Sequence, residues 1–231
     1  MKLLSQKLLQ QYLHDDSIKK FMDEHVSVED EELTCQKYLR ESAPKRLIFK
    51  LLYGDLLNSK IEKSKILDVG GGIIGLTNFL SINHDYFLID LQAHNSFSEY
   101  KRAIKKSGRD FIYPLDWLDH KNDSYDIIIA NDIFPNMDQR LEMFLEHYLP
   151  RCKQLRISLT WYNFVNYYQV KRIDKEDIFT MLSWDLKQLM SVIKKYKNCI
   201  IDYSPENFSI ENISLYSNTR QVGIIVFRGN L

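Results

Sequence analysis

Four aspartates, Asp68, Asp90, Asp116 and Asp132, lie at or near the ends of short apolar runs. Such runs suit buried strands, and the carboxyl ends of parallel strands meet at one edge of a sheet. Carboxylates gathered at that edge could accept hydrogen bonds from hydroxyl groups or stand beside a cation, but they would be unfavourable next to a phosphate. The four residues therefore predict a site for a cationic or hydroxylated ligand.

The stretch from Lys65 to Leu80 places the first of these acids at a glycine-rich turn. A short apolar run precedes it, and apolar residues at helical spacing follow it, which predicts a strand, a tight turn and a helix. Gly70, Gly72 and Gly75 alone satisfy the fingerprint of a dinucleotide loop, in which a helix N-terminus faces a pyrophosphate. Asp68, two residues before the first glycine, instead favours S-adenosylmethionine, which has an ammonium, a sulfonium and a ribose.

The segment Leu67-Asp-Val-Gly-Gly-Gly72 resembles the first motif of the class I S-adenosylmethionine-dependent methyltransferases, acid-x-Gly-x-Gly-x-Gly. The third glycine position holds Ile74, and Gly75 lies one residue late. The resemblance implies an α/β fold with a Rossmann-like, seven-stranded, mostly parallel sheet in the order 3-2-1-4-5-7-6 and helices on both faces. It assigns residues 61–231 to the cofactor-binding domain and residues 1–60 to a helical extension, either a lid over the cofactor or a packing element.

The later acids acquire roles within this resemblance. Asp90, followed by Leu91, would accept from the ribose hydroxyls, as it would in a nicotinamide enzyme. Asp116 would accept from the adenine amino group, and Trp117 would pack on the adenine face or belong to the core. The predicted cofactor-binding residues are Asp68, Gly70, Gly72, Asp90, Leu91, Asp116, Trp117 and Asn131.

The segment Ser124–Pro135 resembles the fourth motif of the family and would place Asn131 and Asp132 nearest the transferred methyl group. It lacks the Asn-Pro-Pro-Tyr signature of enzymes that methylate base amino groups. Asp132 is the first candidate for a general base or for orienting the acceptor. His147, Tyr162 and His120 follow, and each is better explained as a surface or packing residue. Asn131 and Asp132 offer only a fragment of a divalent-metal site, so no metal is expected.

Composition narrows the class of partner. In 231 residues, 31 basic side chains balance 31 acidic ones, which argues against nucleic acid and anionic membranes. The three cysteines, Cys35, Cys152 and Cys199, lack metal-like spacing and suit a reducing cytosol. Polar residues interrupt the N-terminus before a signal sequence could form, and no apolar run reaches membrane-spanning length. We therefore expect a cytoplasmic protein with a small-molecule substrate.

The hydrophobic periodicity predicts amphipathic helices over residues 2–24 and again before residue 57, followed by alternating strands and helices. The aromatic segment 160–168 is interpreted as a pocket wall or a small helical insertion. The predicted strands are Ile66–Val69, Tyr86–Ile89, Phe111–Leu115, Tyr125–Ala130, Leu155–Thr160, Cys199–Tyr203 and Val222–Arg228. The predicted helices after the first strand end near Asn83 or cover Ser96–Lys106, Asp138–Tyr148 and Trp184–Tyr196.

These features predict a methyltransferase that forms S-adenosylhomocysteine. Its preferred acceptor is an oxygen of a sugar or a phosphorylated precursor, by resemblance to bacterial enzymes of surface-polysaccharide modification. Basic residues that could meet an acceptor phosphate or carboxylate, but by default are solvated, are Arg151, Lys153, Arg156, Lys171 and Arg172. Two alternatives stay open. An NAD(P)-dependent oxidoreductase would use the three glycines and Asp90 but leave Asp68 and Asp116 without a role, and a non-catalytic methyltransferase fold would only bind a partner.

Overall fold

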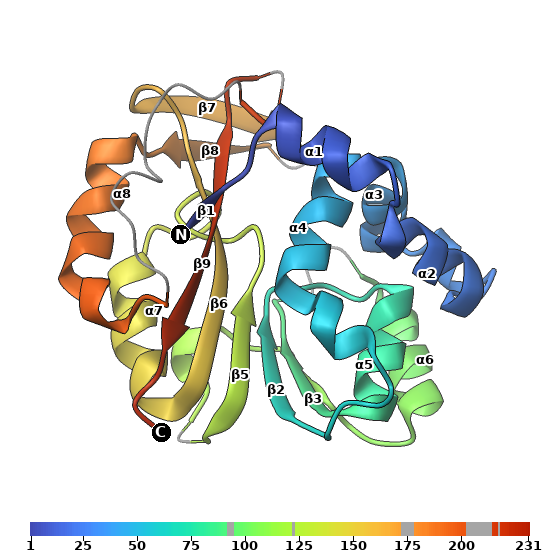
Figure 1. Ribbon diagram of the computed structural model, residues 1–231. Coiled ribbons are helices and arrows are strands. Elements are labelled where there is room, and N and C mark those ends of the chain that lie inside the picture. Colours follow the sequence, from blue (N-terminus) through green and yellow to red (C-terminus); the bar gives the residue numbers. More distant parts are fainter. Residues whose placement is uncertain (92–94, 122, 172–177, 202–213, 217) are drawn as a thin grey trace.

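A seven-stranded sheet forms the centre of the molecule, with the strand order β1-β9-β6-β5-β2-β3-β4 (Figure 1). The computed structural model describes residues 1–91, 95–121, 123–171, 178–201, 214–216 and 218–231. The strands of the sheet are β1 (Lys2–Leu3), β2 (Lys65–Val69), β3 (Asp85–Ile89), β4 (Ile112–Tyr113), β5 (Tyr125–Ala130), β6 (Cys152–Trp161) and β9 (Gln221–Arg228). Strands β2 to β6 are parallel, whereas β9 runs antiparallel to β6. The predicted fold class is confirmed.

Helices cover both faces of this sheet. Ile66 packs in the hydrophobic cluster that contains the N-terminal helices, while the next residue, Leu67, packs in the cluster on the opposite face. This alternation explains why the parallel strands are apolar almost throughout, since both of their faces are buried. The helices are α1 (Gln6–Leu13), α2 (Ser17–His25), α3 (Thr34–Glu41), α4 (Ala43–Tyr53), α5 (Gly75–Asn83), α6 (Phe97–Ser107), α7 (Leu141–Tyr148) and α8 (Leu186–Ile193), and the 3₁₀ turns are η1 (Asp30–Glu32), η2 (Gly54–Leu57), η3 (Trp117–Asp119), η4 (Leu149–Arg151) and η5 (Lys194–Cys199).

The outer edge of the sheet beside β9 differs from the predicted order. Its place is taken by β1, whose Lys2 and Leu3 pair antiparallel with Ile224 and Gly223. The prediction of a helix from residue 2 is wrong here, because the open edge of β9 offers backbone partners that local helix propensity cannot match. Of the predicted strand at 199–203, Ile200 forms an isolated bridge, and residues 202 and 203 lie outside the described part of the chain.

A second, two-stranded sheet follows β6. It consists of β7 (Asn166–Lys171) and β8 (Ile178–Ser183), which pair antiparallel. The helical insertion considered for residues 160–168 is therefore wrong. Aromatic and β-branched residues in this segment suit a strand, and the Ser183 hydroxyl supports its start by accepting from the Asn166 N–H at 2.9 Å.

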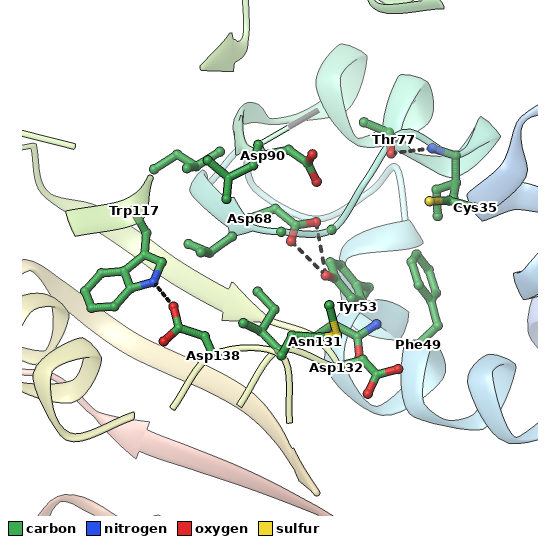
Figure 2. A pocket seen from close by; sticks show the side chains of 18 of the residues that line it. Cys35, Phe49, Tyr53, Asp68, Thr77, Asp90, Trp117, Asn131, Asp132 and Asp138 are labelled. Carbon is green, nitrogen blue, oxygen red and sulfur yellow. Dashed lines mark hydrogen bonds between the residues drawn. The ribbon is translucent and has the colours of Figure 1, made fainter. Parts of the chain in front are cut away.

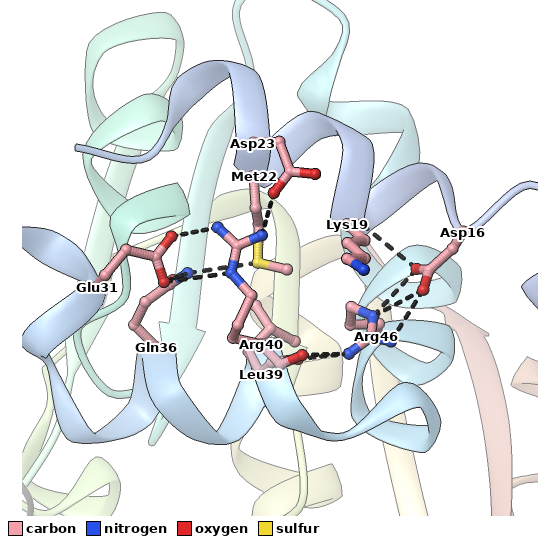
Figure 3. A network of polar contacts seen from close by, with 9 residues as sticks. All are labelled: Asp16, Lys19, Met22, Asp23, Glu31, Gln36, Leu39, Arg40 and Arg46. Atoms are coloured by element: carbon pink, nitrogen blue, oxygen red, sulfur yellow. Dashed lines mark hydrogen bonds and ion pairs between the residues drawn. The ribbon is translucent and has the colours of Figure 1, made fainter. Parts of the chain in front are cut away.

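Polar contacts hold the N-terminal helices to one another (Figure 3), and the pair of Arg46 with Asp16 is more buried than the pairs that Arg40 forms. The Arg46 guanidinium donates to both carboxylate oxygens of Asp16 and to the backbone of Leu39, joining α4 to α2 and α3. Arg40 pairs in the same way with Glu31 and Asp23. These contacts join α2, η1, α3 and α4 to one another. In the described residues, no helix is long and apolar enough to cross a membrane.

Candidate functional site

A pocket of about 830 Å³ lies at the carboxyl ends of β2, β3 and β5, closed on one side by α3 and α4. Its volume falls in the upper part of the range of roughly 300–1,000 Å³ that is usual for ligand sites. The predicted residues that line it are Asp68, Gly70, Asp90, Leu91, Asp116, Trp117, Asn131 and Asp132. The topology therefore brings together eight of the nine predicted residues, and Gly72 is the exception.

Asp68 projects from β2 beneath the glycine loop (Figure 2). It is 4% exposed, and its carboxylate accepts hydrogen bonds from Tyr53 at 3.0 Å and from Tyr86 at 2.6 Å. Burial raises the pKa of Asp68 to about 7, although the two tyrosine hydroxyls act in the opposite direction. A Cβ on Gly71 would lie 2.5 Å from the Asp68 oxygens, so glycine is needed where the loop crosses this carboxylate.

Four consecutive backbone N–H groups of the glycine loop, those of residues 72–75, donate to side chains. Gly72 donates to Asp90 and Ile73 donates to Asn95, each at 3.2 Å. Ile74 donates to Thr77 at 3.1 Å, and Gly75 donates to Gln36 at 3.2 Å. A pyrophosphate would need these same donors. The loop is thus built around carboxylates and amides, which disfavours a dinucleotide.

Gly75 serves packing in this loop. A Cβ at Gly75 would lie 2.5 Å from the Val26 side chain, so the glycine lets the end of α2 approach α5 closely. It does not line the pocket. Gly72 has a φ of 65°, in the left-handed region that favours glycine, and a Cβ at this position would lie 2.7 Å from the Cys35 sulfur. Glycine is therefore needed here for the turn and for the close approach of α3.

Asp90 stands directly after β3, beside the glycine loop. Its carboxylate accepts from the Gly72 N–H and, at 3.3 Å, from the Tyr100 hydroxyl. Leu91 is 69% exposed at the rim of the pocket. A carboxylate held by two donors at the end of the second parallel strand is positioned to accept further hydrogen bonds from a diol.

Asp116 and Trp117 are tied into a polar cluster with Arg140 and Asp138. Arg140 donates to both Asp116 oxygens, at 3.2 and 2.7 Å, and its guanidinium lies 4.7 Å from the centre of the Trp117 ring. Burial alone would raise the pKa of Asp116, but hydrogen bonds from Arg140 and the Leu118 N–H outweigh it and hold that pKa below its usual value. The Trp117 indole N–H donates to Asp138 at 2.8 Å. The ring is 5% exposed, so it belongs to the core and also forms part of the pocket wall.

Asn131 and Asp132 follow β5 and lie on the opposite side of the pocket from Asp90 (Figure 2). Ser158 fixes both: its hydroxyl donates to the Asn131 side chain at 3.0 Å and accepts from the Asp132 N–H at 2.7 Å. Asp132 has a φ of 61°, a left-handed conformation that aspartate tolerates better than most residues. The Asp132 carboxylate forms an ion pair with Arg220.

Sequence reasoning missed the contribution of α4. Lys45, Phe49 and Tyr53, spaced four residues apart, place one face of this helix in the pocket, and Phe49 stacks on Tyr53 with ring centroids 4.3 Å apart. The spacing was visible in the sequence, but nothing local showed which face would turn to the ligand. Tyr38 and Cys35 of α3 extend the same wall. The role of residues 1–60 as a lid stays a prediction.

The remaining candidates lie away from the pocket. His120 contacts Tyr125 at 3.2 Å, His147 contacts Arg151 at 2.8 Å, and Tyr162 contacts Tyr168 at 3.3 Å. Among the other basic candidates, Arg156 is buried against Asp55, and Lys153 pairs with Asp126. The Lys171 side chain and Arg172 lie outside the described residues. In the described parts of the chain, no group of three or more His, Cys, Asp or Glu side chains could hold a metal ion.

Comparison with known proteins identifies the fold. No protein-family model matches the sequence, and no curated protein matches it. Among solved structures, the chain is similar to the 1,6-didemethyltoxoflavin-N1-methyltransferase of Burkholderia thailandensis, with bound 1,6-didemethyltoxoflavin and S-adenosylhomocysteine (TM-score 0.50, 12% identity, 100% of this chain and 93% of that chain covered).

It is also similar to the magnesium protoporphyrin IX methyltransferase of Synechocystis PCC 6803, with bound S-adenosylmethionine (TM-score 0.50, 11% identity, 97% and 96% covered). The order of the parallel strands, β6-β5-β2-β3-β4, also agrees with the order that the family resemblance of the sequence implies. The chain therefore has the Rossmann-like fold of the S-adenosylmethionine-dependent methyltransferases.

Proposed function

We propose that this protein is a methyltransferase that binds S-adenosylmethionine and transfers its methyl group to a small-molecule acceptor. The observation that carries the proposal is the chemistry of the glycine loop. Two carboxylates, Asp68 and Asp90, adjoin it, and the N–H groups at the start of α5 are taken by side chains. Such a loop suits a cofactor with hydroxyls and positive charge and opposes a pyrophosphate, so we favour this function over an NAD(P)-dependent oxidoreductase.

The residues divide into groups that would hold different parts of the cofactor. Asp90 would accept from the ribose hydroxyls, and Leu91 and Trp117 would contact the adenine. Asp116 would accept from the adenine amino group only if its pairing with Arg140 were shared or loosened. Asp68 and the backbone of Gly70 would lie beside the amino-acid part. When bound, S-adenosylmethionine would supply a methyl group on a sulfonium that needs no further activation.

The protein then has to align the acceptor with the methyl group and accommodate any proton that the acceptor loses. Asn131 and Asp132 are the polar residues at the end of β5, and Ser158 fixes both of them. Asp132 is the candidate for orienting or deprotonating an acceptor oxygen, and its ion pair with Arg220 keeps the carboxylate fixed in direction. An oxygen of a sugar or phosphorylated metabolite remains the predicted target.

Calorimetric titration of the purified protein with S-adenosylhomocysteine, and in parallel with NAD⁺ and NADP⁺, tests the proposal. We expect micromolar binding of S-adenosylhomocysteine and no measurable binding of either dinucleotide. Binding of a dinucleotide without S-adenosylhomocysteine would show that the donors of the glycine loop are released on binding and that the oxidoreductase alternative is correct. If none of the three ligands binds, both enzymatic functions are refuted and the non-catalytic alternative stands.

A further inference from the structure

Two cationic side chains flank the acceptor side of the pocket: Lys45 lines it, and Arg220 lies outside the lining and pairs with Asp132, which does line it. Arg220 immediately precedes β9, and because β9 is antiparallel to β6, its first residues lie at the same sheet edge as Asp132 after β5. Lys45 reaches the pocket from the first turns of α4. Burial lowers the pKa of the Lys45 ammonium, and the positive charge of Arg220 lowers that pKa further.

The Arg220 guanidinium is incompletely paired. Its side chain is 14% exposed, and one terminal nitrogen forms the ion pair with Asp132. In the part of the chain that the structure describes, its Nε is buried without a hydrogen-bond partner, and so is the hydroxyl of Tyr216, whose ring centre lies 5.2 Å from the guanidinium carbon. An unsatisfied buried donor costs about 1–3 kcal/mol, and more when the donor is charged. Because both atoms are enclosed by protein, a ligand would satisfy them once the Arg220 or Tyr216 side chain turns toward the pocket.

Lys45 brings a second positive charge to the acceptor side of the pocket, and no carboxylate among the described residues forms an ion pair with it. Its ammonium lies 5.0 Å from the centre of the Tyr38 ring. Burial is the main reason that its pKa lies below the usual value. Among the described residues, the ion pairs of these two cations involve one carboxylate, that of Asp132. The positive charge in this partly dehydrated place therefore exceeds the negative charge paired with it, which is unfavourable until an anion compensates it.

We propose that Lys45 and Arg220 form the subsite for an anionic group, a carboxylate or a phosphate, carried by the methyl acceptor. This inference rests on the proposed methyltransferase function and names the class of its substrate. The acceptor is favoured over the cofactor as the source of the anion because Arg220 is bound to Asp132 at the end of β5. The residues that the proposed function assigns to the cofactor lie in β2 or follow β2, β3 and β4 instead. Guanidinium groups bind carboxylates and phosphates through paired hydrogen bonds, which suits the free Nε.

The variants Arg220→Met and Lys45→Met remove one cation each while keeping the apolar stem. Matched controls are Arg228→Met, at the exposed far end of the same strand, and Lys50→Met, on the solvent side of the same helix. Binding to the protein saturated with S-adenosylhomocysteine is measured for inorganic phosphate and for two probe pairs, glucose 6-phosphate with glucose and 4-hydroxybenzoate with 4-hydroxybenzamide. Ionic strength is held constant, and circular dichroism verifies folding of each variant.

We expect inorganic phosphate and at least one anionic probe to bind, the probe at least tenfold more tightly than its neutral partner. Each pocket variant should weaken that binding at least tenfold, and the controls should leave it unchanged. Failure of inorganic phosphate and both anionic probes to bind, or equal binding by the pocket variants and the controls, would overturn the proposal. If Arg220→Met does not fold, Lys45→Met carries the same test.

A second titration separates the two sources of an anion. S-adenosylhomocysteine carries a carboxylate, whereas 5′-methylthioadenosine lacks the amino-acid part. If Lys45→Met and Arg220→Met weaken binding of S-adenosylhomocysteine at least tenfold but not that of 5′-methylthioadenosine, the subsite holds the carboxylate of the cofactor and the assignment to the acceptor is wrong. Equal affinities in wild type and variants support the acceptor. Failure of wild-type protein to bind S-adenosylhomocysteine would refute the methyltransferase function itself, whatever the anions do.

Discussion

The buried carboxylate of Asp68 makes the stability of the ligand-free protein depend on pH in a predictable direction. Burial raises its pKa from the ordinary 3.8 to about 7. Between these values the folded protein keeps a proton that the unfolded chain has released, so stability falls as the pH rises and levels off above about pH 7. From about pH 5 to 7 the loss is about 2.3 kcal/mol, since each unit corresponds to 1.36 kcal/mol and the folded carboxyl is already half ionised at its pKa of about 7.

Asp68→Asn removes the titration while keeping the size of the side chain. We expect the free energy of unfolding of the wild type to fall relative to that of Asp68→Asn by about 2.3 kcal/mol across this range. Urea unfolding followed by circular dichroism at several pH values measures the difference, and the shared titration of histidines cancels in it. Asp126→Asn is the control, because Lys153 lowers the pKa of that carboxyl and places its effect at acidic pH.

Tyr53→Phe provides a second test of the same reasoning. The Tyr53 hydroxyl donates to both Asp68 oxygens and lowers the pKa of that carboxyl. Its removal should therefore extend the fall in stability to higher pH. A difference between wild type and Asp68→Asn that stays constant from about pH 5 to 8 would show that Asp68 does not titrate there and would refute the reasoning.

Three further predictions follow from the pocket. Asp90→Ala should weaken binding of S-adenosylhomocysteine roughly 10- to 100-fold in calorimetry, since a hydrogen bond to a charged acceptor is worth about 1.5–3 kcal/mol. Asp85→Ala, at the other end of β3, is the control. Equal affinities of the wild type and Asp90→Ala would show that Asp90 does not hold the ribose. Gly75→Ala should destabilise the fold by about 1–3 kcal/mol, because the added methyl group would clash with Val26, and should leave cofactor affinity unchanged. Adding Val26→Ala to this variant should restore part of the lost stability in urea unfolding. A loss of cofactor affinity in Gly75→Ala would instead make Gly75 a cofactor contact. Binding of S-adenosylhomocysteine should change the tryptophan fluorescence, and Trp117→Phe should abolish the change, because Trp117 lines the pocket and Trp161 and Trp184 do not; a signal that persists in Trp117→Phe would place the adenine elsewhere.

The sequence was most informative where one short segment both forms a strand and carries a site residue at its end. The apolar run before Gly70 specifies a buried strand, and the register of parallel strands then brings Asp68 and Asp90 to the same edge. The predicted strand Tyr125–Ala130 has the observed bounds for the same reason, since its continuous apolar run is typical of a strand buried on both faces.

Features that depend on distant partners could not be read in this way. The first residues form a strand only because the outer edge of β9 is open to them, and their own sequence favours a helix. Asp116 has the position that its motif predicts, yet its pairing with Arg140 depends on the path of the chain after β5. Arg220 and Lys45 are far apart in sequence, and only the antiparallel return of β9 brings Arg220 to the pocket edge.

The helical extension joins folding and ligand binding in this chain. Apolar residues of α1 to α4 share one hydrophobic cluster with β2 and β3. The hydroxyl of Tyr53, a member of this cluster, donates a hydrogen bond to Asp68 at the pocket. Arg156 of β6 secures the same end of α4 by donating to the Leu52 carbonyl at 2.7 Å and pairing with Asp55. A ligand that contacts Tyr53 and Phe49 would therefore stabilise the packing of α4 on the sheet, because binding to the folded state alone adds to its stability. Removing the extension would expose the sheet and open the pocket at once, so cofactor affinity and fold stability are not separable by truncation.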